Sequence, residues 1–207
     1  MRNAAELPFV VKICGITNEE DARAAVEAGA NALGFNFWPR SPRCIAPEAA
    51  ARIVSRVPGD YLKVGVFVNT SADEMLGIAA EVPLDVLQLH GEQIAIPERM
   101  PCRVWRAIAA ENLPKNDASG FDAYLVDTPT PDFGGSGKTF DWTVAAGRKY
   151  PIVLAGGLAA DNVREAIETV RPWGVDACSR LELAPGRKDI QRVREFIRAA
   201  QAASQRL

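Results

Sequence analysis

The chain has 207 residues, of which 48% are hydrophobic and 24% charged, with a formal net charge of -2. This composition is typical of a folded domain with one sizeable core. The charges form no basic stripe, no apolar run has the length of a membrane helix, and the first residues lack the apolar stretch of a signal peptide. We therefore expect neither a nucleic acid nor a membrane as a partner.

Strand and helix patterns alternate along the whole chain. Apolar runs typical of buried strands cover residues 9–14, 32–37, 61–68, 84–89, 103–108, 123–126, 152–154 and 174–177. Helices are predicted over 19–28, 47–57, 72–81, 141–149, 159–170 and 190–203, while the helix after the fifth strand, within 110–120, is short or degenerate. Eight such units predict an α/β fold, a single-domain (β/α)₈ TIM barrel over residues 1–207, in which 1–8 form an N-terminal extension. The alternative is a doubly wound open sheet.

Two reactive side chains come at the ends of predicted strands. Cys14 ends the first strand and Asp127 the sixth, and the alternation of side chains gives both an inward direction. A thiol and a carboxyl at one rim of a barrel can act as base and acid in moving a proton, with Lys12 as the nearby cation that favours the thiolate. The alternatives are a small buried hydrophobic side chain for Cys14 and a loop cap for Asp127.

The loops after the last two strands are typical of a phosphate site. Gly156 and Gly157 follow the seventh strand and leave backbone amides open to an anion. The segment Asp176-Ala177-Cys178-Ser179-Arg180 ends the eighth strand and can begin a short extra helix. In this fold a phosphate is frequently bound by these two loops. Paired glycines can also serve tight packing alone.

Further candidates lie after the second strand and on the fourth. Arg43, in Ser41-Pro42-Arg43, can hold a planar carboxylate through two hydrogen bonds, and the alternative is a solvated loop arginine. Gln88 and His90 share one face of the fourth strand. Because His90 is the only histidine, it is expected to bind or support rather than to ligate a metal, and no metal site is predicted.

The four cysteines show no Cys-x-x-Cys pair, which favours a reducing, cytoplasmic location over a disulfide framework or a zinc site. Two of them, Cys14 and Cys178, end the first and eighth strands. These strands are neighbours in a closed barrel, so both thiols are expected at one rim, where an oxidant could join them. The alternative is that Cys178 fills a serine-sized space and Cys14 oxidises alone.

Several stretches together resemble the phosphoribosylanthranilate isomerase family of tryptophan biosynthesis. They occur in the family's order from about Val10 to the last helix: Lys12–Thr17, Gly34-Phe35 with Ser41-Pro42-Arg43, Val64–Asn69, Leu87–Gly91, Val126-Asp127-Thr128, Gly134–Gly137 and Ala155–Leu158. The resemblance implies an Amadori rearrangement of N-(5-phosphoribosyl)anthranilate to 1-(2-carboxyphenylamino)-1-deoxyribulose 5-phosphate, without metal or cofactor. It makes Asp127 the general acid, Cys14 the general base and Arg43 the contact of the anthranilate carboxylate.

The chain departs from the family after the eighth strand. The family commonly has Ser-Ser-Gly-Val-Glu there, whereas this chain has Cys178-Ser179-Arg180-Leu181-Glu182. Arg180 removes backbone freedom but adds a cation, and we expect it to grip the phosphate. The alternatives are a related sugar-phosphate isomerase of histidine biosynthesis, whose two aspartates this chain does not match at Cys14, and a non-catalytic phosphate-binding barrel. The assembly is either a monomer or a homodimer.

Overall fold

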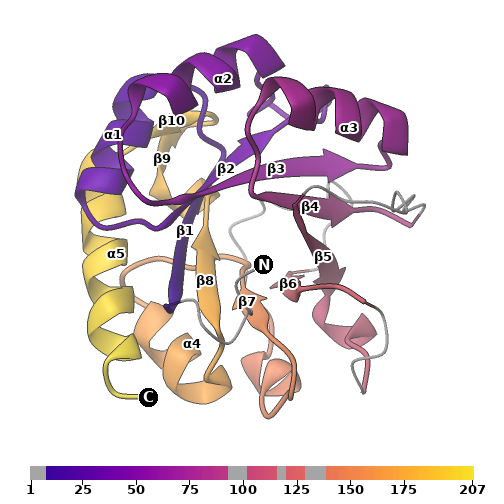
Figure 1. The fold of residues 1–207 in the computed structure, drawn as a ribbon. Coiled ribbons are helices and arrows are strands. Elements are labelled where there is room, and N and C mark those ends of the chain that lie inside the picture. Colours follow the sequence, from indigo (N-terminus) through magenta and orange to yellow (C-terminus); the bar gives the residue numbers. More distant parts are fainter. Residues whose placement is uncertain (1–7, 93–101, 116–119, 129–138) are drawn as a thin grey trace.

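Parallel strands close a barrel in chain order (Figure 1). The computed structural model describes residues 8–92, 102–115, 120–128 and 139–207. The strands of the barrel are β1 (Val10–Cys14), β2 (Ala32–Asn36), β3 (Leu62–Val68), β4 (Val86–His90), β5 (Arg103–Ala109), β6 (Ala123–Asp127), β7 (Ile152–Leu154) and β8 (Gly174–Ala177). Because β1 pairs with both β2 and β8, the sheet has no open edge. The predicted (β/α)₈ barrel is confirmed, and the open sheet is wrong.

Helices pack around the outside of the barrel (Figure 1). The α-helices are α1 (Glu19–Glu27), α2 (Pro47–Arg56), α3 (Ala72–Glu81), α4 (Val163–Val170) and α5 (Ile190–Ser204). The described residues also form the 3₁₀ turns η2 (Ala110–Asn112), η3 (Trp142–Ala145) and η4 (Ser179–Leu181). The side chains of Asn18, Ser71 and Asp189 cap α1, α3 and α5 by accepting hydrogen bonds from backbone N–H groups of the first turn.

Two predicted helices are shorter in the structure. The helix expected over 141–149 is only η3, and the chain then reaches Gly147 at φ 70°, which a helix does not accommodate. The helix expected over 159–170 begins at Val163. Before it, the Asn162 side chain accepts a hydrogen bond from Ala159 N and donates one to Gly157 O, which favours a closed loop. The short helix expected within 110–120 is the 3₁₀ turn η2.

Side chains alternate between two cores. Inward-facing residues fill the barrel with one apolar cluster, which includes Val10, Trp105 and Leu125. Outward-facing residues such as Ile13 and Val126 pack under the helices in a second, larger cluster. This alternation of inward-facing and outward-facing side chains follows from the pleat of each strand. It leaves the last inward-facing side chains of β1 and β6 at the carboxyl end of the barrel.

A small hairpin at the mouth of the barrel was not predicted. Strands β9 (Glu182–Ala184) and β10 (Arg187–Lys188) pair antiparallel around Pro185-Gly186. Thr17 donates its hydroxyl to Gly186 O, and Lys188 N donates to Asp21 Oδ2 at 2.8 Å, so the hairpin is fastened beside α1. It brings Glu182 and Lys188 to the end of β8.

Some predictions concern segments outside the described residues. These are most of the N-terminal extension, the loop 129–138 with its Gly134–Gly137 motif, and the stretch 93–101. The assignment of 1–207 to a single domain therefore stays a prediction. Within the described ranges, no helix has the length and apolar character needed to cross a membrane.

Candidate active site

The thiol of Cys14 lies next to a buried ion pair. Lys12, two residues earlier on the inward face of β1, is fully buried and donates to Asp176 Oδ1 of β8 at 2.8 Å. Although burial acts in the opposite direction, Asp176 and Cys14 raise the pKa of Lys12 above its ordinary value, which keeps it charged. Gly34 has no side chain, which leaves space for Cys14 and Lys12, since a Cβ there would lie 2.7 Å from Cys14 Sγ and 3.0 Å from Lys12 Nζ.

Cys14 and Cys178 lie side by side, as expected from barrel closure. Pairing of Ile13 with Ala177 aligns the ends of β1 and β8, and both cysteines are free thiols. A hydrogen bond from Cys178 and the charge of Lys12, opposed by burial, lower the pKa of Cys14 to about 6. Cys14 is therefore largely a thiolate at neutral pH, the form that can accept a proton. The oxidation of the two thiols stays a prediction.

The pKa of Asp127 is shifted upward, in contrast to that of Cys14. Burial in the barrel mouth and the negative charges of Asp176 and Cys14, opposed by the hydrogen bond from Thr128 N and by Lys12, raise the pKa of Asp127 to about 7. The Thr128 amide donates to Asp127 Oδ1 at 2.7 Å and fixes the carboxyl. A carboxyl with this pKa keeps part of its protons at neutral pH and can serve as a general acid.

A cavity of about 580 Å³ opens over these groups, a size that suits a small organic molecule. Cys14, Asp127 and Asp176 line it together with Arg43, Gln88, His90 and Cys178. Val66, Val68, Leu125 and Trp38 add an apolar side. The structure thus brings most of the sequence-predicted site residues to one cavity.

Gln88 and His90 form a buried pair at the end of β4. Gln88 Nε2 and His90 Nε2 are 2.7 Å apart. Burial and the positive charges of Lys12 and Arg106 lower the pKa of His90 to about 3, so its ring is neutral at physiological pH. Gln88 Oε1 is buried without a hydrogen-bond partner among the described residues. Because a buried oxygen of this kind normally has a donor, it is suited to a hydroxyl of a bound molecule.

Arg43 differs from the expectation, because its guanidinium already holds a carboxylate of the protein. Its Nε donates to both carboxylate oxygens of Glu182, and its Nη2 donates to Oε2 at 2.7 Å. Glu182 is buried and also pairs with Lys188 Nζ at 2.9 Å. The hairpin therefore orients Arg43 at the edge of the cavity.

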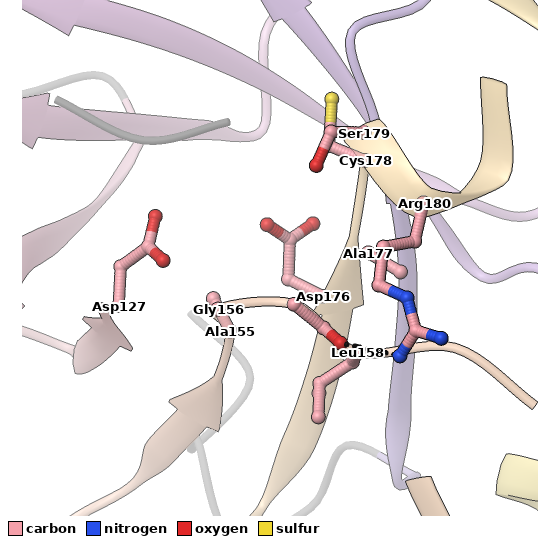
Figure 2. Close-up of a pocket in the computed structure, with 10 residues that line it drawn as sticks. Asp127, Ala155, Gly156, Leu158, Asp176, Ala177, Cys178, Ser179 and Arg180 are labelled. Atoms are coloured by element: carbon pink, nitrogen blue, oxygen red, sulfur yellow. Dashed lines mark hydrogen bonds between the residues drawn. The ribbon is translucent and has the colours of Figure 1, made fainter. Parts of the chain in front are cut away.

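A second, small cavity lies between the ends of β7 and β8, with a volume of about 30 Å³ (Figure 2). Gly156, Gly157, Cys178, Ser179 and Arg180 line it, together with Asp127 and Asp176. Gly156 and Gly157 have φ angles of 85° and 63°, a region that favours glycine. A Cβ at Gly156 would also lie 3.1 Å from Asp127 Oδ1. The predicted phosphate loop and the predicted acid are therefore in direct contact.

Arg180 does not extend its guanidinium toward the two carboxylates. Its Nη1 donates to Gly157 O at 3.1 Å, and its Nη2 pairs with Asp161 Oδ2 at 2.6 Å. Figure 2 shows the side chain running away from Asp127 and Asp176. Asp161 attracts the cation, and Arg180 braces the loop that follows β7. Because Arg180 also lines the small cavity, the expected grip on a phosphate stays a prediction.

The sequence reading missed the contribution of Glu182 and Lys188. Lys188 is fully buried, contacts Cys178 Sγ at 3.7 Å and pairs with Glu182. The turn-forming Pro185-Gly186 pair between them was the available signal for a hairpin. Among the described residues, no group of three or more His, Cys, Asp or Glu side chains is placed to hold a metal ion.

Fold and site define a (β/α)₈ barrel with a thiolate and a carboxylic acid facing one cavity beside a glycine loop for an anion. A model of the family described as N-(5'phosphoribosyl)anthranilate (PRA) isomerase matches residues 11–199. The N-(5'-phosphoribosyl)anthranilate isomerase of Solibacter usitatus is 46% identical over 199 residues, covering 94% of this chain and 98% of the relative. The chain belongs to the phosphoribosylanthranilate isomerase family.

Solved structures agree with this assignment. The phosphoribosyl anthranilate isomerase of Thermotoga maritima has a TM-score of 0.81 and 42% identity, with 94% of this chain and 99% of that chain covered. A structure of the enzyme in complex with reduced 1-(o-carboxyphenylamino)-1-deoxyribulose 5-phosphate has a TM-score of 0.79 and 38% identity, with the same coverage. A further structure, at 38% identity, a TM-score of 0.77 and the same coverage, describes monomers generated from the dimeric Thermotoga maritima enzyme.

Proposed function

We propose that this chain converts N-(5-phosphoribosyl)anthranilate to 1-(2-carboxyphenylamino)-1-deoxyribulose 5-phosphate, a step of tryptophan biosynthesis. The observation that carries the proposal is the pair of groups facing the main cavity, a thiol with a pKa of about 6 and a carboxyl with a pKa of about 7. An aldose-to-ketose rearrangement requires a proton donor and a proton acceptor in the same site, and this pair supplies both near neutral pH.

The two groups act in sequence. Asp127 gives its proton to the ring oxygen, and the furanose opens to a Schiff base. The Cys14 thiolate then takes the proton from the second sugar carbon, which leaves an enolamine. The enolamine then tautomerises to the ketone: the first sugar carbon gains a proton, and the hydroxyl on the second carbon loses one. Lys12 stabilises the thiolate before the proton arrives, because its charge lies next to Cys14.

The remaining site residues bind the substrate. We assign the phosphate to the loops that carry Gly156, Gly157, Cys178 and Ser179, which line the small cavity beside Asp127. Arg43, oriented by Glu182, lines the main cavity and is suited to the anthranilate carboxylate. We assign the sugar hydroxyls to Gln88, His90 and Asp176, which line the main cavity.

Turnover of the natural fluorophore tests the proposal. Phosphoribosylanthranilate generated in situ should lose its fluorescence when the purified protein is added, and the absence of any loss would contradict the proposed function. Cys14→Ala and Asp127→Asn should each reduce kcat by roughly a hundredfold to ten-thousandfold. Cys44→Ala, at an exposed thiol outside the cavity, is the control. Near-normal turnover in either active-site variant would overturn the assigned roles.

We also propose a cytoplasmic location. Cys14, Cys44, Cys102 and Cys178 are all free thiols, and free thiols persist in a reducing compartment. A cell fractionation with detection of the tagged protein tests this, and recovery from an oxidising compartment would contradict it.

A further inference from the structure

Two cations share a single buried carboxylate at the mouth of the barrel. Glu182 pairs with Arg43 Nη2 at 2.7 Å and with Lys188 Nζ at 2.9 Å. The side chain of Glu182 is 3% exposed, that of Lys188 is fully buried, and that of Arg43 is 14% exposed. The cluster therefore carries one more positive charge than negative, in a place where water screens charges weakly.

The hydrogen bonds to Glu182 fill both of its carboxylate oxygens. Oε1 accepts from Arg43 Nε at 3.0 Å and from Lys188 Nζ at 2.9 Å. The backbone N–H of Gly186, at 3.3 Å, and the thiol of Cys178, at 3.8 Å, donate to the same oxygen. Oε2 accepts from Nε and Nη2 of Arg43. Since a carboxylate accepts about four hydrogen bonds, Glu182 has no capacity for a further donor.

Arg43, in contrast, retains donors for a second carboxylate. Its guanidinium has five N–H groups, and Glu182 engages only Nε and Nη2. Nη1 has no hydrogen-bond partner within the parts of the chain that the structure describes. Because Arg43 lines the main cavity and Lys188 does not, an anion there would contact Arg43 and would experience Lys188 through its charge alone.

The charge of Lys188 determines whether Arg43 can still attract an anion. If Lys188 were absent, the pair of Arg43 and Glu182 would be neutral, and Glu182 would repel a second carboxylate at close range. Lys188 offsets the charge of Glu182. One carboxylate can thus orient the guanidinium while the guanidinium binds another.

We propose that Lys188 is a positioning residue, which offsets the charge of Glu182 so that Arg43 can bind a carboxylate of the substrate. The proposal rests on the proposed function, because it extends the assignment of the anthranilate carboxylate to Arg43. The hairpin of β9 and β10, which lies beside α1 in Figure 1, fixes Lys188 through the hydrogen bond from its backbone N–H to Asp21 Oδ2.

Calorimetric binding of two probes tests the proposal without turnover. The probes are reduced 1-(o-carboxyphenylamino)-1-deoxyribulose 5-phosphate and the same compound without its carboxyl group. Lys188→Met removes the charge and keeps an apolar stem, so it should raise the Kd of the first probe about tenfold and leave that of the second within about twofold. Arg187→Met removes an exposed charge from the same strand and should leave both Kd values unchanged.

A second substitution separates the charge of Lys188 from its packing. Adding Glu182→Gln to Lys188→Met removes the charge that Lys188 offsets, so part of the lost affinity for the carboxylated probe should return. If circular dichroism shows that Lys188→Met does not fold, Lys188→Gln retains a donor for Glu182 and should show the same selective loss. Equal weakening of both probes, no weakening of the first, or a further loss in the double variant would overturn the proposal.

Turnover of phosphoribosylanthranilate by the unmodified protein distinguishes this proposal from the proposed function. A selective loss of the carboxylated probe in Lys188→Met, together with no turnover by the unmodified protein, supports the role of Lys188 and contradicts the function. Turnover together with equal changes in both Kd values does the reverse. If the carboxylated probe did not bind the unmodified protein, both proposals would be wrong.

Discussion

Cys14 and Asp127 must be in opposite protonation states for the proposed reaction, the thiol without its proton and the carboxyl with it. Their environments favour this arrangement, since a donor and a cation act on Cys14 whereas burial and two neighbouring negative charges act on Asp127. Asp176 and Cys178 reach these two groups because the closing of the barrel brings β8 and the residue after it beside β1. Part of their chemistry thus comes from neighbours distant in sequence.

The pH dependence of kcat/KM should be bell-shaped. Activity should rise with pH as Cys14 loses its proton near its pKa of about 6, and should fall as Asp127 loses its proton near its pKa of about 7. The maximum lies between the two, and because the groups interact, the observed values belong to the pair. Rates measured in overlapping buffers should show both limbs. In Asp127→Asn the falling limb should disappear from the residual activity, and its persistence would identify another group as the acid.

The inward directions of Cys14 and Asp127 were predictable because a strand alternates its side chains strictly. The directions of Arg43 and Arg180 were not. An arginine has many rotamers, and its guanidinium goes to the nearest carboxylate that tertiary structure offers. Here these partners are Glu182, on an unpredicted hairpin, and Asp161, in a loop expected to be helix. Sequence alone therefore identified both arginines but did not predict the carboxylates of the protein that hold their guanidinium groups.

Among the elements, the loop between β7 and α4 determines the geometry of the phosphate site. Gly156 lies against Asp127 and Thr128, and Asn162 and Arg180 both bond the carbonyl of Gly157 from the outside. The loop is thus held between the acid on one side and η4 on the other. The helix predicted over 159–170 begins later than expected because the Asn162 side chain bonds backbone groups of the loop instead of allowing a helical turn.

Removing the brace of this loop should weaken substrate binding more than turnover. Arg180→Ala deletes the bonds to Gly157 O and Asp161, and we expect KM and the inhibition constant of inorganic phosphate to rise about two- to tenfold with little change in kcat. Arg164→Ala, which breaks an exposed pair with Glu168 on α4, is the matched control. If Arg180→Ala lowered kcat and left KM unchanged, the brace would serve the chemical step instead.

For the whole molecule, the strands were readable because buried parallel strands appear as nearly continuous apolar runs. Their closure into one barrel depends on β1 meeting β8, which are joined by backbone pairing and by a single buried ion pair, Lys12 with Asp176. This pair links residues 164 positions apart. It lies on the same inward face as Cys14, so stability and chemistry depend on one contact.

Lys12→Met should therefore reduce both the stability and the activity of the protein. It leaves Asp176 buried without its partner, and we expect a loss of about 3–5 kcal/mol in the free energy of unfolding, measured by denaturant titration. Lys63→Met is the control, because its pair with Asp85 is partly exposed, at 25% and 36%, and should contribute at most about 1 kcal/mol. Adding Asp176→Leu to Lys12→Met removes the second charge and should restore part of the stability but none of the activity. Equal losses for Lys12→Met and Lys63→Met would show that the buried pair does not hold β1 against β8.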